Sequence, residues 1–385
     1  MSVNIKILGA LTLLHFTGDF YSAFISPLFP VFVDTLGLSL TEIGVIAGTM
    51  RFLAFIIQPT VGYLADRSPT RSFIFVGVVL PVFFIPLSGL APNFWLLLLC
   101  VALGSIGSSM FHPSVTGMVP LYAGTKASFS MSIFNTGGTL AFGLGPLFIT
   151  WYVASFGLTA MPLTMIAGLL VIGYLLRVIP KPQSEGLTRT GFFGALQESL
   201  GSAWKVIAII WLVMFLRAIV GQAFLTFMPV LYVQEGFSVV QSGAIYSLFT
   251  VAGTVSGLLS GHISDRIGFK PVFIFTFLIM APALWLLLQL RGNWVYCGAA
   301  LAGAVVFASL PLGVTMAQTL APKGRSMVAS LMMGFAYGLG GVITPVIGKL
   351  ADTYTIRPVL TVIACLPLFI VLIIIAFFPK IRSHG

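Results

Sequence analysis

Long apolar segments separated by short polar stretches run along the whole chain. Each segment is long enough to cross a hydrocarbon core of roughly 30 Å as an α-helix. The pattern predicts membrane-spanning helices near residues 5–33, 41–65, 72–91, 94–119, 127–153, 158–179, 205–233, 239–264, 271–290, 294–319, 326–351 and 357–379. Of the 385 residues, 58% are hydrophobic and only 7% are charged. Lipid is therefore the expected solvent for most of the chain.

The longest polar interval, residues 180–204, divides the predicted helices into two groups of equal size. We predict an all-α integral membrane protein with an N-terminal six-helix bundle at 1–179 and a C-terminal six-helix bundle at 205–385. The second part of the interval, from Phe192 to Trp204, is expected to form a short helix at the membrane surface.

A charged motif occurs twice, at matching places in the two halves. Both copies read G-x-x-x-D-R with a base four residues after the Arg; the residues are Gly62, Asp66, Arg67 and Arg71, then Gly261, Asp265, Arg266 and Lys270. An ordinary cytoplasmic turn with positive flanking charges would explain one copy. Two copies favour a charged latch between helices, and we expect these residues to act in gating.

This repeated motif resembles the signature loop of the major facilitator superfamily. The resemblance implies a secondary transporter of twelve helices in two six-helix halves.

The positive charges gather on one side of the predicted helices. The net charge is +10, and most of the Lys and Arg residues fall in loops or helix ends on the side of both termini. By the positive-inside rule that side is cytoplasmic. The basic balance is thus a topology signal and favours no nucleic-acid partner. We expect a multi-pass protein of the bacterial cytoplasmic (inner) membrane.

Small residues and proline recur in the fifth span of each half. We select Gly138, Gly145 and Pro146 in the first half, and Gly341 and Pro345 in the second. Glycine permits close helix approach and proline loosens a helix. The segments either pack tightly or form the surfaces that slide during alternating access.

Ionisable side chains inside a span cost about 2.5–3.5 kcal/mol each on insertion scales, so each needs a reason. His15 and Asp19, at i and i+4, share one face of the first span, and His112 precedes Pro113 in the fourth. We predict proton coupling at His15, Asp19 and His112. A satisfied structural pair between His15 and Asp19 is the alternative.

Two arginines inside spans suggest an anionic substrate, because a guanidinium does not lose its proton. Arg51 needs an anion, either Asp19 or a substrate carboxylate or phosphonate. Arg217 is the best candidate in the second half, although it could instead extend toward the cytoplasmic surface. The predicted substrate-binding set is Arg51, His112, Arg217, Gln222, Asn135 and Tyr337.

Within the superfamily, four stretches resemble the fosmidomycin-resistance branch. They are His15-x-x-x-Asp19, Gln58-Pro59-x-Val61-Gly62-Tyr63, the stretch from Gly104 to Phe111-His112-Pro113, and the fifth-span glycines ending in Gly145-Pro146. The resemblance implies proton-driven export of small compounds, with a phosphonate antibiotic as the namesake substrate. The chain departs from the family pattern after Phe-His-Pro, where Ser114 and Gly117 stand in place of an acid and a base.

The favoured function is therefore a proton-coupled exporter of small, anionic organic compounds that works by alternating access. Uptake by symport, anion exchange and a transport-dead receptor of the same fold stay open. Nine acids and four histidines, widely scattered, argue against an enzyme. No phosphate-binding G-x-x-x-x-G-K-[ST] loop occurs. We expect no cofactor and no metal; the expected partners are the substrate, protons and lipid, and the expected state is a monomer.

Overall fold

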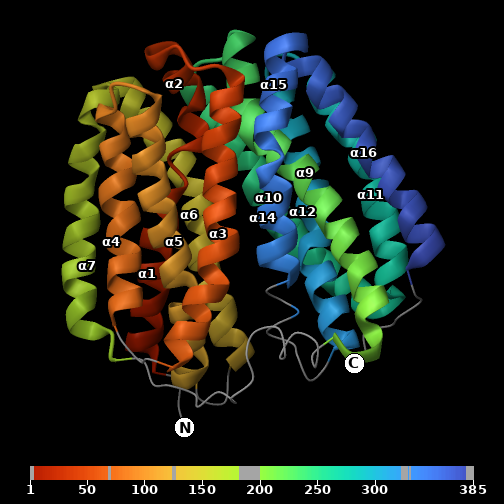
Figure 1. Cartoon of the computed structure of the whole chain (residues 1–385), viewed down its shortest axis with the longest axis horizontal. Helices are drawn as coiled ribbons and strands as arrows, with labels where there is room; N and C mark the ends of the chain where they lie inside the picture. Colours follow the sequence, from red (N-terminus) through yellow and green to blue (C-terminus); the bar gives the residue numbers. More distant parts are fainter. Residues whose placement is uncertain are drawn as a thin grey trace. The chain divides into compact units, whose positions relative to one another are not determined.

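The computed structural model describes residues 4–67, 71–123, 127–181, 200–321, 328 and 331–378. Within these ranges it has 12 helices long and apolar enough to cross a membrane, which confirms the predicted all-α fold class. The expected surface helix from Phe192 lies outside the described residues as far as position 199. The chain forms two compact units, each described by itself below (Figure 1).

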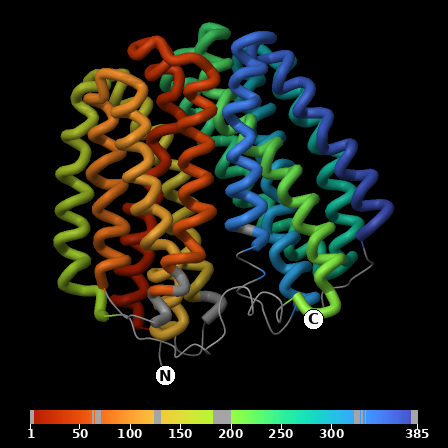
Figure 2. The backbone as a smooth tube through the Cα atoms, in the orientation of Figure 1, coloured from red at the N-terminus to blue at the C-terminus, as the bar shows by residue number. Residues whose placement is uncertain are grey.

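The first unit comprises Met1–Leu38, Phe52–Thr188 and Phe237–Gly243. Its central helix α1 packs against α4, α5, α6 and α7. The elements are α1 (Ile5–Ser22), η1 (Ser26–Leu28), α2 (Phe29–Leu36), most of α3 (Leu40–Arg67), α4 (Ser72–Leu87), η2 (Ser88–Leu90), α5 (Phe94–Tyr122), α6 (Ala127–Phe156), η3 (Leu158–Thr164) and α7 (Met165–Val178). The first predicted span is thus one run of α1, η1 and α2, which Figure 2 traces in red.

Glycine brings the helices of the first unit into backbone contact. A Cβ atom on Gly77 of α4 would lie 2.7 Å from the Phe111 backbone nitrogen of α5, and one on Gly145 of α6 would lie 2.9 Å from the Phe20 carbonyl oxygen of α1. Both separations are shorter than a van der Waals contact, so no larger residue fits without moving a helix. Gly18 of α1 likewise lies against the Phe111 ring of α5, so α1 contacts both α5 and α6 closely.

The second unit comprises Ser39–Arg51, Arg189–Gly236 and Ala244–Gly385. Its central helix α9 contacts α12, α14, α15 and α16. The elements are η4 (Gly201–Ala203), α9 (Trp204–Gln234), α10 (Val239–Ile267), α11 (Phe269–Gln289), α12 (Trp294–Leu320), a π-helical segment (Leu331–Ala336), α14 (Tyr337–Val342), α15 (Thr344–Tyr354) and α16 (Ile356–Phe377). The first turns of α3 also belong here: the Thr344 hydroxyl donates to the Gly44 carbonyl at 2.8 Å.

The fifth spans of the two halves differ in continuity. Helix α6 runs unbroken through Pro146, whereas the corresponding span of the second half divides into the π-helical segment, α14 and α15, with Pro345 in the first turn of α15. A π-helical segment inserts an extra residue into the helical hydrogen-bond ladder and turns the side chains that follow. Tyr337 begins the helix directly after this segment.

Candidate functional site

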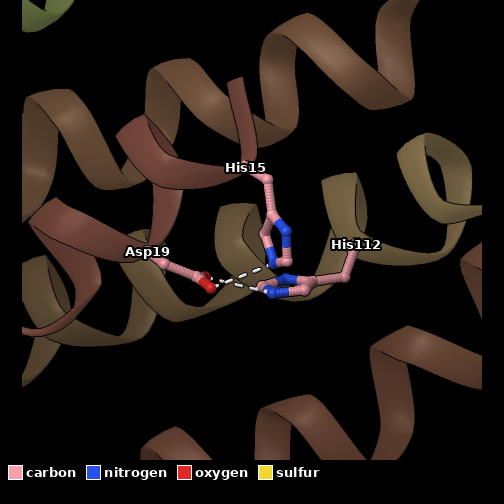
Figure 3. Close-up of side chains that lie close together, drawn as sticks. All are labelled: His15, Asp19 and His112. Carbon is pink, nitrogen blue, oxygen red and sulfur yellow. Dashed lines mark ion pairs between the residues drawn. The ribbon is translucent and has the colours of Figure 1, made fainter. Parts of the chain in front are cut away.

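A cluster of three ionisable side chains lies in the first unit, between α1 and α5. Asp19 is 2% exposed and faces two imidazoles: His15 Nε2 lies 3.1 Å from Asp19 Oδ2, and His112 Nε2 lies 3.0 Å from Asp19 Oδ1 (Figure 3). His15 and Asp19 share one face of α1, as their i, i+4 spacing predicted. His112 comes from α5, so a tertiary contact completes what we call the His–Asp–His cluster.

Backbone atoms and aromatic rings hold both imidazoles in place. His15 Nδ1 lies 3.0 Å from the Phe134 carbonyl oxygen of α6, and its ring stacks on that of Phe134 at 4.2 Å between centroids. His112 Nδ1 lies 2.6 Å from the Ser108 carbonyl oxygen one turn earlier on α5, and its ring stacks on Phe111 at 4.2 Å. Each imidazole is therefore oriented through its Nδ1 side, and its Nε2 side faces the carboxylate.

Gly138 closes the cluster from the side of α6. A Cβ atom at this position would lie 2.8 Å from both Asp19 Oδ2 and His15 Nε2. Among the described residues, His15, Asp19 and His112 are also the group whose spacing would admit a metal ion, with donor atoms within 4.8 Å of one another. One protonated imidazole already balances the charge of the carboxylate, so ion pairing accounts for the arrangement.

A second polar cluster lies in the second unit, around α9. Arg217 is fully buried. One of its guanidinium nitrogens, Nη1, donates to the Val306 carbonyl oxygen of α12 at 3.1 Å, and the group lies 5.8 Å from the centre of the Phe307 ring. Its Nε and Nη2 donors have no hydrogen-bond partner among the described residues. Arg217 therefore points into the bundle and does not extend toward the membrane surface.

Arg51, Gln222 and Tyr337 come together in the same unit. Arg51 Nε donates to Gln222 Oε1 at 3.1 Å, and its guanidinium lies 5.1 Å from the centre of the Tyr337 ring. The Gln222 amide nitrogen is buried and has no hydrogen-bond partner in the described part of the chain. The Arg217 guanidinium interacts electrostatically with Tyr337, so we group these four residues as the arginine cluster.

The arginine cluster carries two guanidiniums without an acid. In the described ranges, neither Arg51 nor Arg217 forms an ion pair with a carboxylate. A cation buried without an anion is strongly unfavourable, and free N–H donors in a buried site suit the oxygen atoms of an anionic ligand. Of the remaining predicted substrate-binding residues, Asn135 has an exposed side chain on α6 of the first unit, and His112 is part of the His–Asp–His cluster.

The repeated charged motifs place their last base at equivalent positions. Arg71 Nη1 donates to the Leu176 carbonyl oxygen near the end of α7 at 3.5 Å, and Lys270 Nζ donates to the Ile375 and Phe378 carbonyl oxygens at the end of α16 at 2.9 and 2.8 Å. A cation at the C-terminal end of a helix stabilises its free carbonyls. The side chains of Asp66 and Arg67 lie outside the described part of the first motif.

Two further polar contacts were not predicted from the sequence. Glu235, at the end of α9, pairs with Arg291 at 3.1 Å and with Arg357. The Asp352 carboxylate of α15 accepts hydrogen bonds from the Leu40 and Thr41 backbone nitrogens at 2.8 and 2.9 Å, and so caps the N-terminus of α3. Both contacts join residues far apart in the chain, and no local pattern marks them.

Comparison with known proteins decides the family. The model of the Major Facilitator Superfamily matches residues 11–345. The chain belongs to the Major Facilitator Superfamily. The twelve candidate spans found in the described residues and the repeated charged motif agree with that membership.

Two curated members of the superfamily match almost the whole chain, and a third matches about half of it. The fosmidomycin resistance protein of Escherichia coli (strain K12) is 28% identical over 98% of this chain and 93% of its own length. The uncharacterized MFS-type transporter YfnC of Bacillus subtilis (strain 168) is 30% identical over 96% of this chain and 92% of its own length. The quinolone resistance protein NorA of Staphylococcus aureus (strain MRSA252) is 26% identical over 47% of this chain and 46% of its own length.

Solved structures share the fold at low sequence identity. A bacterial homologue of the human lysosomal transporter Spinster matches with a TM-score of 0.81 at 16% identity, over 98% of both chains. The nucleoside transporter NupG matches with a TM-score of 0.79 at 14% identity, over 97% of this chain and 99% of its own. Family and fold are those of secondary transporters in the membrane, which carry small molecules.

Proposed function

We propose that this member of the superfamily exports small organic anions in exchange for protons. The observation that carries the proposal is the arginine cluster, in which Arg51 and Arg217 lack an acidic partner within the described residues. Buried N–H groups without a hydrogen-bond partner favour a ligand whose oxygen atoms can accept from them. An analogue without those oxygen atoms would leave the N–H groups unpaired and would therefore bind more weakly. A phosphonate or carboxylate group supplies such oxygen atoms.

Proton coupling is assigned to the His–Asp–His cluster of the first unit. Histidine is the side chain whose ordinary pKa lies closest to physiological pH, and two histidines here face one buried carboxylate. A change in their protonation changes the charge inside the first unit, which can bias the equilibrium between two conformations of the transporter.

Export is the proposed direction because of two relatives. The similarity to a fosmidomycin resistance protein covers 98% of the chain, and the similarity to a quinolone resistance protein covers 47% of it. Resistance follows when a transporter removes the compound from the cell. From the gathering of Lys and Arg on the side of both termini, we further propose that both termini are cytoplasmic and that the protein lies in the bacterial inner membrane. Proton-coupled uptake is the second candidate, since it uses the same two clusters.

Substrate-driven proton flux in proteoliposomes tests the proposal. Purified protein would be reconstituted with a trapped pH dye, and fosmidomycin would serve as the phosphonate probe beside a panel of small carboxylates and neutral compounds. Movement of protons opposite to the anion, lost in Asp19→Asn, is the expected result. Movement of both in the same direction would identify symport. Anion exchange without proton movement would contradict the proposed coupling.

The charged motifs are proposed to act in gating. The double variant Asp66→Asn with Asp265→Asn should slow transport about tenfold, on the order of 1.4 kcal/mol in the barrier, and should leave the affinity for the anion unchanged. Turnover would be measured as anion exchange and affinity by equilibrium binding. Wild-type turnover in the double variant would remove the gating role.

A further inference from the structure

The position of the Nδ1 protons fixes how the two histidines meet Asp19. A carbonyl oxygen can only accept a hydrogen bond. The Phe134 oxygen at 3.0 Å from His15 Nδ1 and the Ser108 oxygen at 2.6 Å from His112 Nδ1 therefore both require Nδ1–H. A neutral imidazole carries a single N–H. In its neutral form, each of these rings consequently has a bare lone pair at Nε2.

Both Nε2 atoms face the same carboxylate, at 3.1 Å from His15 and 3.0 Å from His112. An ionised carboxylate presents only lone pairs, so a neutral imidazole in this orientation would be repelled. The contact is attractive when Nε2 carries a proton and the ring is a cation. With Asp19 ionised, this geometry is attractive when both rings are imidazolium ions, and removal of either Nε2 proton turns an attraction into a repulsion.

The two histidines differ in how they are held. The His15 side chain is 9% exposed and is fixed by α6 through the Phe134 carbonyl and ring. The His112 side chain is 28% exposed and its Nδ1 partner lies on its own helix, α5. The His112 ring is thus the less enclosed of the two, and it can leave Asp19 without breaking a contact to another helix through Nδ1.

Within the described residues, the helices packed around the cluster supply no further ionisable partner. On α1, Lys6 stands exposed in the first turn, away from His15. Helix α4 contains no titratable residue. On α6, Tyr152 donates to the Ala160 carbonyl oxygen, and on α1, Tyr21 donates to Thr164. On α7, Tyr174 is exposed and Arg177 stands in the last turn; on α5, Cys100 and Tyr122 stand away from His112, near the two ends of the helix.

We propose that the coupling proton is carried by His112 at Nε2, while Asp19 stays ionised throughout the cycle as the counter-ion. The inference rests on the proposed proton coupling and names the group that performs it. Release of the proton lowers the charge of the cluster from +1 to 0 and drives the His112 ring away from Asp19. That movement, on α5 beside Pro113, is the step that links protonation to conformation.

Histidine-selective ¹⁵N NMR tests the location of the proton without any substrate. The full-length protein in nanodiscs would carry His262→Gln and His384→Gln, which leaves His15 and His112 as the observed rings. As the pH rises, one Nε2 resonance should change from protonated to unprotonated, and the same signal should be absent in His112→Gln. Both Nδ1 nitrogens should stay protonated. Titration of the His15 ring in place of His112 would overturn the assignment.

Infrared difference spectra test the role of Asp19. Asp19→Asn identifies which protonated-carboxyl band, if any, belongs to Asp19. Over the same pH range, the wild-type protein should show no such band. The appearance of such a band would place the proton on the carboxylate and would contradict the inference.

Transport provides the functional readout. His112→Gln should lower the ratio of protons to anions moved by at least about tenfold, whereas His262→Gln, on the exposed part of α10, should match the wild type. A wild-type ratio in His112→Gln overturns the inference. Absence of proton flux in the wild-type protein instead contradicts the proposed function, and the NMR titration then decides separately whether His112 is the titrating group.

Discussion

The His–Asp–His cluster and the arginine cluster balance their buried charges in opposite ways. In the first unit one buried acid, Asp19, faces two histidines, which can gain and lose protons. In the second unit two arginines, which keep their charge, lack an acid within the described ranges. The first cluster can balance its own charge by titration. The second can balance its charge only by binding an anion, and this difference separates a proton site from a substrate site.

A third cluster sharpens the comparison. Glu235 lies between Arg291 and Arg357 in the second unit, as Asp19 lies between two histidines in the first. The Glu235 cluster thus resembles the His–Asp–His cluster in geometry, with one acid between two basic side chains. Its charges stay fixed, as in the arginine cluster, because arginine does not titrate at physiological pH. We therefore expect it to stabilise the fold and to take no part in the proton cycle.

Removal of the buried guanidinium should have the largest effect. Arg217→Gln should weaken binding of anionic substrates by roughly 30-fold or more, since truncation of a buried, hydrogen-bonded charge in a binding site costs about 2–5 kcal/mol. Binding of neutral compounds should change far less. Equilibrium binding to the detergent-purified protein measures both, with Arg291→Gln, whose side chain is 67% exposed, as the matched control. An equal loss for anionic and neutral ligands would assign Arg217 to structure.

A methyl group placed in the first cluster should uncouple it without removing an ionisable residue. In Gly138→Ala the new Cβ would lie 2.8 Å from Asp19 Oδ2, and overpacking of this kind costs about 1–3 kcal/mol. Substrate-driven proton flux should fall by about tenfold. Gly173→Ala on α7, where a Cβ meets nothing within 4 Å, is the control and should behave as the wild type. Normal coupling in Gly138→Ala would show that the carboxylate need not hold its present position.

The membrane-spanning helices and part of the candidate site could be predicted from the sequence, because such helices leave a strong local signal. The twelve apolar segments and the shared face of His15 and Asp19 depend on residues close together in the chain. The contact of His112 with Asp19 depends on how α1 and α5 pack, and no spacing specifies it. Asp19 was also a candidate partner of Arg51, yet its ion pairs are with the histidines, while Arg51 donates to Gln222. The π-helical segment before Tyr337 comes from a backbone shift, which leaves no residue pattern.

Loss of the acid from the third cluster should affect stability alone. Glu235→Gln should lower the free energy of unfolding by about 1–3 kcal/mol, because Arg357, with a side chain 24% exposed, would keep a poorly compensated charge. Arg291→Gln should cost less than about 1 kcal/mol, since Arg291 is the exposed member of its pair with Glu235 and water screens that interaction. Thermal unfolding of the purified protein compares the two variants. A changed proton-to-anion ratio in Glu235→Gln would contradict the separation of structural and proton-carrying acids.

The smallest effect is expected at the cap of α3. Asp352→Asn keeps one acceptor oxygen and loses the charge near the helix N-terminus, so the free energy of unfolding should fall by about 0.5–1 kcal/mol. Asp34→Asn, at an exposed position of α2, is the control for loss of an acid as such. A shift in thermal unfolding that is no larger for Asp352→Asn than for Asp34→Asn would show that the cap contributes nothing beyond its charge.

The same cap has a consequence for biosynthesis. The Leu40 backbone nitrogen finds its partner 312 residues later in the chain. At a translation rate of about 5–20 residues per second, the start of α3 leaves the ribosome roughly 15–60 s before Asp352 is made. During that interval water at the membrane surface must satisfy its free N–H groups. The last helices to be inserted therefore complete one of the first. A nascent chain truncated before α15 would keep the local cap between Ser39 and Glu42, but the Leu40 and Thr41 N–H groups of α3 would lack their protein partner.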